Sequence, residues 1–237
     1  MEYFRAHRSI RFLNCPRIER GFSLIELLVV LGIIGVITVT VITSQNSFNK
    51  SITLVNTAYD IALTLRSAQT YGLGSRAAGG VVNTPYGLHF DTSNNKSFIL
   101  FADTSPGGGN VTGANCAATD VGTPNCQPGD YVYTSGVDAA PIQTYAIGNG
   151  LYIQDFCAYA LGAWTCKSGG SLTSLDIAFG RPDPDPNISK NGSYAAPPNQ
   201  ATQACIVLAA SNAPSGPYRY IKVVQSGEIT ASGTVCP

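Results

Sequence analysis

The chain has 237 residues, of which 44% are hydrophobic and only 12% are charged. This balance excludes an intrinsically disordered chain that is kept open by its charges. The formal net charge is zero, but residues 1–21 carry +3 and the remainder carries −3. A mildly acidic remainder argues against general nucleic-acid affinity, which needs clustered lysine and arginine side chains.

A basic segment precedes an apolar run at the start of the chain. Residues 1–21 hold five arginines against two acids, Glu2 and Glu19. Residues 22–42 form a run of 21 residues in which Glu26 is the one charged residue. As a helix this run spans about 30 Å, the thickness of the hydrocarbon core of a bilayer. The sequence predicts a membrane-spanning helix with the basic segment on the cytoplasmic side.

The apolar run differs from a secretory signal peptide and from a plain anchor. A signal peptide is shorter and is followed by a small-residue cleavage site, whereas polar residues 43–46 lead directly into more helical sequence. A plain anchor would exclude Glu26, because an acid at the bilayer centre costs roughly 2.5–3.5 kcal/mol. We therefore expect Glu26 to have a partner. The alternative, a side chain that snorkels near the helix start, stays open.

Residues 20–30 read Arg-Gly-Phe-Ser-Leu-Ile-Glu-Leu-Leu-Val-Val. This stretch resembles the processing and assembly signal of type IV prepilins and type II secretion pseudopilins. The resemblance implies that prepilin peptidase removes residues 1–21 by cutting between Gly21 and Phe22, and then N-methylates Phe22. Glu26 becomes the fifth residue of the mature chain and can pair with the new terminal amine, its own or that of a neighbouring subunit.

Residues 43–78 are expected to continue the helix as an amphipathic segment. Apolar or small residues recur there at steps of four and three, which places one stripe on one face: Leu54, Ala58, Ile61, Leu65 and Ala68. The polar residues around the stripe are unsuited to lipid, so this half should pack on a soluble core. Two glycines near residues 71–74 weaken the helix and indicate its end.

Residues 79–237 are expected to form a β-rich head, which makes the fold class α+β: a pilin-like layout with a long helix on a small antiparallel sheet. Residues 86–91 and 97–101 predict a hairpin, with His89 as an exposed strand residue. Further strands are predicted at 131–133, 151–156, 174–179, 204–209 and 218–224, the last paired with 228–231. Surface loops are predicted at 105–130 and 181–198, which are rich in Gly, Pro and Asn.

Six cysteines follow the apolar run: Cys116, Cys126, Cys157, Cys166, Cys205 and Cys236, with Cys15 before it. An even set beyond a membrane segment is typical of disulfides in an oxidising compartment. Sequence proximity favours Cys116 with Cys126 and Cys157 with Cys166, which leaves Cys205 with Cys236. Buried free thiols remain an alternative. A zinc site is disfavoured, because the sequence has no C-x-x-C pair and one histidine beyond the apolar run.

No set of acid, base and nucleophile can be assembled from the sequence, so we expect no catalytic residues, no cofactor and no enzyme. Asp183 and Asp185 could offer oxygens to calcium, but their spacing is not that of a calcium loop, and a solvated turn is favoured. A secreted hydrolase with an uncleaved anchor is the weakest alternative.

The head pattern resembles the H-type minor pseudopilins and the related FimT-like minor pilins. The residues that carry this likeness are the helix end at 63–69, the hairpin at 86–101, residues 175–180 and residues 220–229. The resemblance implies a structural subunit, more probable as a minor than as a bulk component, of a type IV pilus or a type II secretion pseudopilus. A DNA-binding minor pilin for natural transformation is the alternative, for which Arg219 and Lys222 are the only close basic pair late in the chain.

The same resemblance implies the partners and the location of the chain. The partners are other pilin or pseudopilin subunits, prepilin peptidase, the inner membrane and its assembly platform. The location is the inner membrane, crossed once, with the head on the periplasmic or extracellular side, and later a filament. Nucleic acid is not an expected partner.

Overall fold

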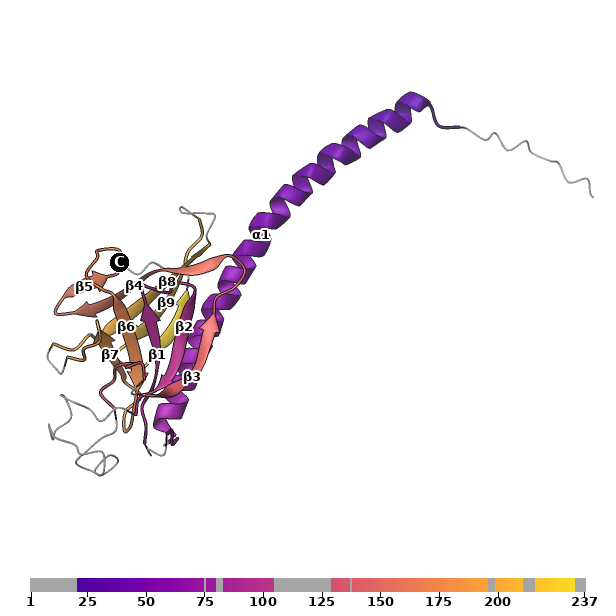
Figure 1. The fold of residues 1–237 in the computed structure, drawn as a ribbon. Helices are drawn as coiled ribbons and strands as arrows, with labels where there is room; N and C mark the ends of the chain where they lie inside the picture. Colours follow the sequence, from indigo (N-terminus) through magenta and orange to yellow (C-terminus); the bar gives the residue numbers. More distant parts are fainter. Residues whose placement is uncertain are drawn as a thin grey trace, which may run out of the picture. The chain divides into compact units, whose positions relative to one another are not determined.

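The computed structural model describes residues 21–74, 76–79, 83–104, 129–136, 138–195, 199–210 and 216–232. Within these residues, one helix is followed by ten strands (Figure 1). Contacts divide the chain into two units, Met1–Asn46 and Ser47–Pro237. The helix α1, Leu24–Leu73, runs from the first unit into the second. The α+β, pilin-like layout predicted from the sequence is confirmed.

The strands of the second unit form two antiparallel sheets of five strands each. The order is β3-β2-β1-β6-β7 in the first sheet and β10-β9-β8-β4-β5 in the second. The strands are β1 Tyr86–Asp91, β2 Ser97–Ala102, β3 Ala139–Ala146, β4 Leu151–Ala160, β5 Ala163–Cys166, β6 Ser174–Phe179, β7 Pro186–Lys190, β8 Gln203–Ala210, β9 Arg219–Val224 and β10 Ile229–Ser232.

The second half of α1 packs into the same core as the two sheets. Every residue of the predicted stripe is at most 1% exposed: Leu54, Ala58, Ile61, Leu65 and Ala68. These side chains join one cluster with the inward-facing residues of both sheets. Polar side chains beside the stripe donate hydrogen bonds to the hairpin of β9 and β10 in the second sheet. Arg66 donates to the Ile229 carbonyl at 3.0 Å, and Gln69 donates to the Gly227 carbonyl at 3.1 Å.

The helix ends at Leu73, which confirms the end predicted near residues 71–74, whereas the segment boundary drawn at residue 78 is too long. The last turn closes where the Gly74 N–H donates to the Thr70 carbonyl at 2.9 Å. Glycine costs roughly 1 kcal/mol relative to alanine in a helix, and Gly72 and Gly74 lie two residues apart. The low helix propensity of the two glycines, rather than the spacing of the apolar residues, therefore determines where the helix ends.

Both predicted hairpins are present. β1 and β2 pair antiparallel in the register Leu88 with Leu100, and β9 pairs with β10 in the register Ile221 with Ala231. The strands predicted at 151–156, 174–179 and 204–209 are found within β4, β6 and β8. β4 extends to Ala160 and turns into β5, which the sequence did not indicate.

Two predictions about the head are wrong. Residues 131–133 form no strand, since residues 131 and 132 are bends, and residues 186–190, predicted as part of a loop, form the edge strand β7. Pro186 is tolerated as the first residue of β7 because an edge strand has a free side that needs no N–H. β3 was also missed, since Ala139 and Pro141 lower its strand propensity. Of the predicted loop 105–130, residues 105–128 lie outside the described residues.

Residues 129–136 cover the outward face of the first sheet. Tyr133 lies against two aromatic side chains of that face, with ring centroids 4.7 Å from His89 and 5.5 Å from Phe101. His89 was predicted to be exposed, but its side chain is only 12% exposed. The alternation rule placed His89 correctly on the face opposite the main core, and the covering segment then buries it.

Candidate functional site: the apolar N-terminal helix

The N-terminal unit begins with the residues of the predicted processing signal. Gly21 has no atom within 4 Å of the position that a side chain would take, and Phe22 is 82% exposed. The helix starts at Leu24, and the Leu27 N–H donates to the Ser23 carbonyl at 3.2 Å. Glu26 lies in the first turn, where an acid stabilises the positive end of the helix dipole.

The apolar run is exposed along its whole length. Residues Leu24–Ile42 have a mean hydropathy of 2.7, and none of them is buried. Among the described residues, this helix is the one long and apolar enough to cross a membrane. A soluble protein rarely exposes such a continuous apolar surface, so this helix needs lipid or another protein as its cover.

Two threonine hydroxyls inside the run form hydrogen bonds to backbone carbonyls of the same helix. The Thr38 hydroxyl donates to the Ile34 carbonyl at 2.7 Å, and the Thr40 hydroxyl donates to the Ile37 carbonyl at 2.8 Å. The threonine hydroxyls therefore cost little in hydrocarbon, whereas the charge of Glu26 is costly there. Gly32 and Gly35 have open space where a side chain would point, so a second helix can approach the backbone there.

The disulfide predicted between Cys157 and Cys166 is confirmed. It joins β4 to β5 at directly paired positions of the second sheet. Cys205 is also disulfide-bonded. Its predicted partner, Cys236, lies outside the described residues, as do Cys116, Cys126 and Cys15. Their pairings stay predictions.

The acidic pair considered for calcium does not belong to a metal-binding cluster in the described part of the chain. Asp183 and Asp185 are exposed and line a hollow of about 250 Å³ together with Arg181. The one group of three ligand-type side chains found among the described residues is Asp155 with Cys157 and Cys166. Because those two sulfur atoms are bonded to each other, they have no thiolate to offer a metal.

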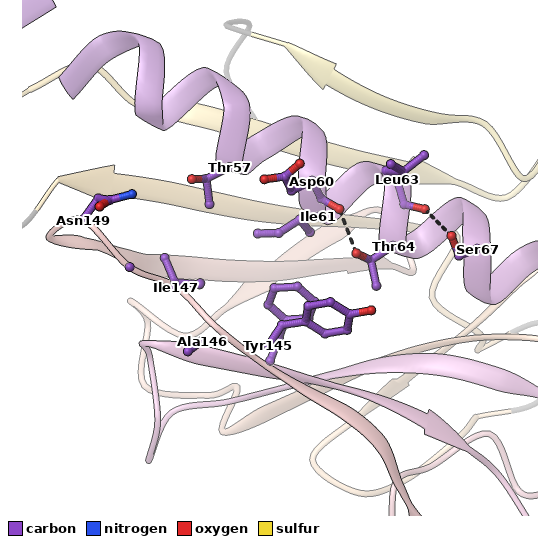
Figure 2. Close-up of a pocket in the computed structure, with 12 residues that line it drawn as sticks. Thr57, Asp60, Ile61, Leu63, Thr64, Ser67, Tyr145, Ala146, Ile147 and Asn149 are labelled. Atoms are coloured by element: carbon purple, nitrogen blue, oxygen red, sulfur yellow. Dashed lines mark hydrogen bonds between the residues drawn. The ribbon is translucent and has the colours of Figure 1, made fainter. Parts of the chain in front are cut away.

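A groove of about 500 Å³ lies between α1 and the end of β3, and the sequence did not indicate it. Figure 2 shows Thr57, Asp60 and Thr64 of α1 on one side, and Tyr145 and Ile147 on the other. The Thr64 hydroxyl donates to the Asp60 carbonyl at 2.8 Å, so it is satisfied within the helix. Its lining combines polar and apolar side chains.

Two buried aspartates in the head were also missed. Asp176 of β6 lies opposite His89 of β1, and its Oδ1 is 2.6 Å from the His89 Nδ1. Burial raises the pKa of Asp176, while the hydrogen bond from His89 lowers it. Asp103, just after β2, is fully buried. No short-range pattern marks either residue, because the groups that bury them come from distant parts of the chain.

The basic pair considered for nucleic acid is divided between the two faces of its strand. Arg219 and Lys222 lie three residues apart on β9, and side chains alternate between faces at every residue. The Arg219 guanidinium donates to the Tyr218 carbonyl at 2.9 Å. The described residues therefore offer no basic stripe built on this pair.

Comparison with known proteins adds one match. Residues 16–42 match the family model described as the prokaryotic N-terminal methylation motif. No curated protein and no solved structure matches the chain. The matched residues cover Arg17 and Arg20 before Gly21, the residue that follows it and the exposed apolar helix, which is consistent with a single-pass anchor in the inner membrane. The chain therefore carries the N-terminal methylation motif of type IV pilin-like proteins, which supports its place in the prepilin and pseudopilin family.

Proposed function

We propose that the chain is a minor structural subunit of a type IV pilus or a type II secretion pseudopilus. The observation that carries this proposal is an apolar helix, exposed from end to end, that holds one acid in its first turn and coincides with the methylation motif. In this proposal the helix is first a membrane anchor and then part of the filament core. The likeness of the head to H-type minor pseudopilins supports a minor subunit.

Processing prepares the helix for assembly. Prepilin peptidase cuts between Gly21 and Phe22, where the absence of a side chain on Gly21 gives the protease close access to the backbone. The cut removes the basic segment and creates an amine at Phe22, which is then methylated. The new amine lies four residues before Glu26, just ahead of the first helical residue, Leu24.

Glu26 would then set the register between subunits. In a low-dielectric surrounding, the attraction between a carboxylate and an ammonium group is far stronger than in water. A neighbouring subunit in the correct register supplies a terminal amine to Glu26, whereas any other register leaves the acid unpaired in an apolar core. The energetic penalty for an unpaired acid makes the pair a ruler for assembly.

Exchange of Glu26 for glutamine in the cell that makes the filament tests this role. We expect filament incorporation, measured by immunoblot of the isolated filaments, to fall by about tenfold or more, since tenfold corresponds to about 1.4 kcal/mol. Asp60→Asn is the matched control, because Asp60 is an exposed acid on the same helix beyond the apolar run. Membrane levels of both variants should equal those of the wild type. Unchanged incorporation of the Glu26→Gln chain would refute the role of Glu26.

A DNA-binding minor pilin remains the alternative function, and no observation on the head favours it. A gel shift with the purified chain in detergent micelles separates the two functions. We expect no salt-sensitive DNA binding, because Arg219 and Lys222 do not share one face of β9.

A further inference from the structure

Asp103 lies in a pocket built around its carboxyl group. It is 0% exposed, and its Oδ2 accepts a hydrogen bond from the Tyr131 N–H at 2.6 Å. The backbone wraps closely around it at Gly129, where φ is +98° and a side chain would collide with the Asp103 carboxyl. The other oxygen, Oδ1, is buried and has no hydrogen-bond partner among the described residues. A buried polar atom without a partner costs free energy, so this oxygen requires an explanation.

A second carboxyl group, that of Asp138, lies within hydrogen-bonding reach of Asp103. Asp138 is 6% exposed. Both of its oxygens already accept backbone hydrogen bonds, Oδ1 from the Thr104 N–H at 3.2 Å and Oδ2 from the Thr134 N–H at 2.6 Å. Asp138 is thus held as an acceptor, which is the role of an ionised carboxylate.

The groups around the pair offer no positive charge. Asp130 and Tyr131 face Asp103 from the covering segment, and Asp138 faces it from the residues before β3. Beyond Asp130, Asp176 on β6 is occupied by His89 on β1. In the part of the chain that the structure describes, the charged groups that act on Asp103 are therefore acids. Two ionised carboxylates side by side in this site would repel each other.

We propose that Asp103 and Asp138 share one buried proton, carried on the Asp103 Oδ1 and donated to the Asp138 carboxylate. One proton gives the unpartnered oxygen a hydrogen bond, removes one of two like charges and leaves every backbone bond of the pair intact. Burial also raises the pKa of Asp103 well above its usual range, and the neighbouring Asp130 and Asp138 raise it further. The proton joins the end of β2 to the segment that leads into β3.

The pH dependence follows from the sign of this shift. Asp103 releases its proton less readily in the folded chain than in the unfolded chain. Its contribution to stability is therefore complete below the ordinary pKa of an aspartate and is lost as the pH rises through the raised pKa of the folded chain. Acidic conditions favour the closed pair, and sufficiently alkaline conditions release it.

Infrared spectroscopy of the full chain in detergent micelles, in heavy water at neutral pH, tests the proposal directly. The carbonyl stretch of a protonated carboxylic acid is expected in the wild type and should lose intensity in Asp103→Asn. The exposed Asp183→Asn is the control that should leave this intensity unchanged. Asp103→Asn should also reduce the fall of Tm with rising pH, because an amide donates the same hydrogen bond without titrating. Asp138→Asn should lower Tm, since an amide nitrogen cannot accept a backbone N–H.

Three results would overturn the proposal. Equal band intensity in the wild type and Asp103→Asn would mean that Asp103 is ionised. An Asp103→Asn chain that does not fold would mean that a neutral donor cannot replace it. Saturable binding of Ca²⁺, with a rise in Tm that both Asp103→Asn and Asp138→Asn abolish, would identify the pair as cation ligands. None of these results bears on the role of Glu26, so this proposal and the proposed function fail independently.

Discussion

Three acidic residues differ in the groups that surround their carboxyl groups: Glu26, Asp103 and Asp176. Glu26 lies in the first turn of an exposed apolar helix. Asp176 has a partner within the head, the His89 imidazole at 2.6 Å. Asp103 has a second carboxyl group beside it. The imidazole thus meets the cost of burying Asp176, and we propose that an amine does so for Glu26 and a shared proton for Asp103.

Replacement of His89 by alanine should destabilise the head by about 1–3 kcal/mol, because it removes the side-chain donor of the buried Asp176 carboxyl. Asp91→Asn is the matched control. Asp91 is 3.8 Å from the other His89 nitrogen and 39% exposed, so its loss should cost less than about 0.5 kcal/mol. Denaturant unfolding of the full chain in detergent micelles, at neutral pH, measures both. Equal effects of the two variants would contradict the special role of Asp176.

Single residues differed in how well the sequence predicted them. Gly21, Phe22 and Glu26 belong to a local signal, made of a basic segment, a glycine and an acid in an apolar run, and their roles stay predictions. His89 was assigned to the correct face of its strand but to the wrong exposure. The Tyr133 ring that covers His89 lies 44 residues later in the sequence, and a local sequence pattern cannot predict a contact between such distant residues.

The junction between α1 and β6 depends on close approach of two backbones. A side chain at Gly72 would collide with the Phe179 carbonyl, and Phe179 is itself fully buried at the end of β6. The helix therefore reaches the sheet only because residue 72 has no side chain.

Gly72→Ala should destabilise the head by about 1–3 kcal/mol despite the higher helix propensity of alanine, because the added methyl group forces α1 away from β6. Gly148→Ala is the control with open space around the added methyl group and should be nearly neutral. Thermal unfolding followed by near-ultraviolet circular dichroism compares the two. A Gly72→Ala chain as stable as the wild type would show that this contact is not required.

The hairpin of β4 and β5 is closed by the Cys157–Cys166 disulfide, nine residues apart in the sequence. Removal of this bond by the double change Cys157→Ala and Cys166→Ala should cost about 2–3 kcal/mol by loop-closure entropy. Denaturant unfolding of the oxidised full chain measures the loss. A cost near zero would mean that strand pairing alone holds β5.

Elements with a regular pattern were predictable, and elements formed by long-range pairing were not. The apolar stripe of α1 and the two hairpins follow local rules of period and turn. β7 and β3 are edge strands that contain proline, so their own residues do not favour a strand. Each forms because a neighbouring strand presents unpaired backbone groups, β6 for β7 and β2 for β3.

At the scale of the whole molecule, the chain combines two units with opposite requirements. The unit Met1–Asn46 contains an apolar helix without a buried residue between Leu24 and Ile42. The unit Ser47–Pro237 has a complete core of its own, made by the second half of α1 and two sheets. The apolar helix of such a chain needs a membrane or other helices of the same kind to cover it.

The layout of the whole molecule was predictable because hydropathy and charge separate the two units so sharply. The number of sheets was not, since strand order depends on pairings between distant residues.

Mass spectrometry of the N-terminal peptide, from the protein isolated out of its native membrane, tests whether the chain is processed as a prepilin. We expect a chain that begins at Phe22 with one methyl group on its terminal amine, and a Gly21→Leu variant that keeps residues 1–21. A native chain that retains residues 1–21, or begins at a residue other than Phe22, would contradict this expectation.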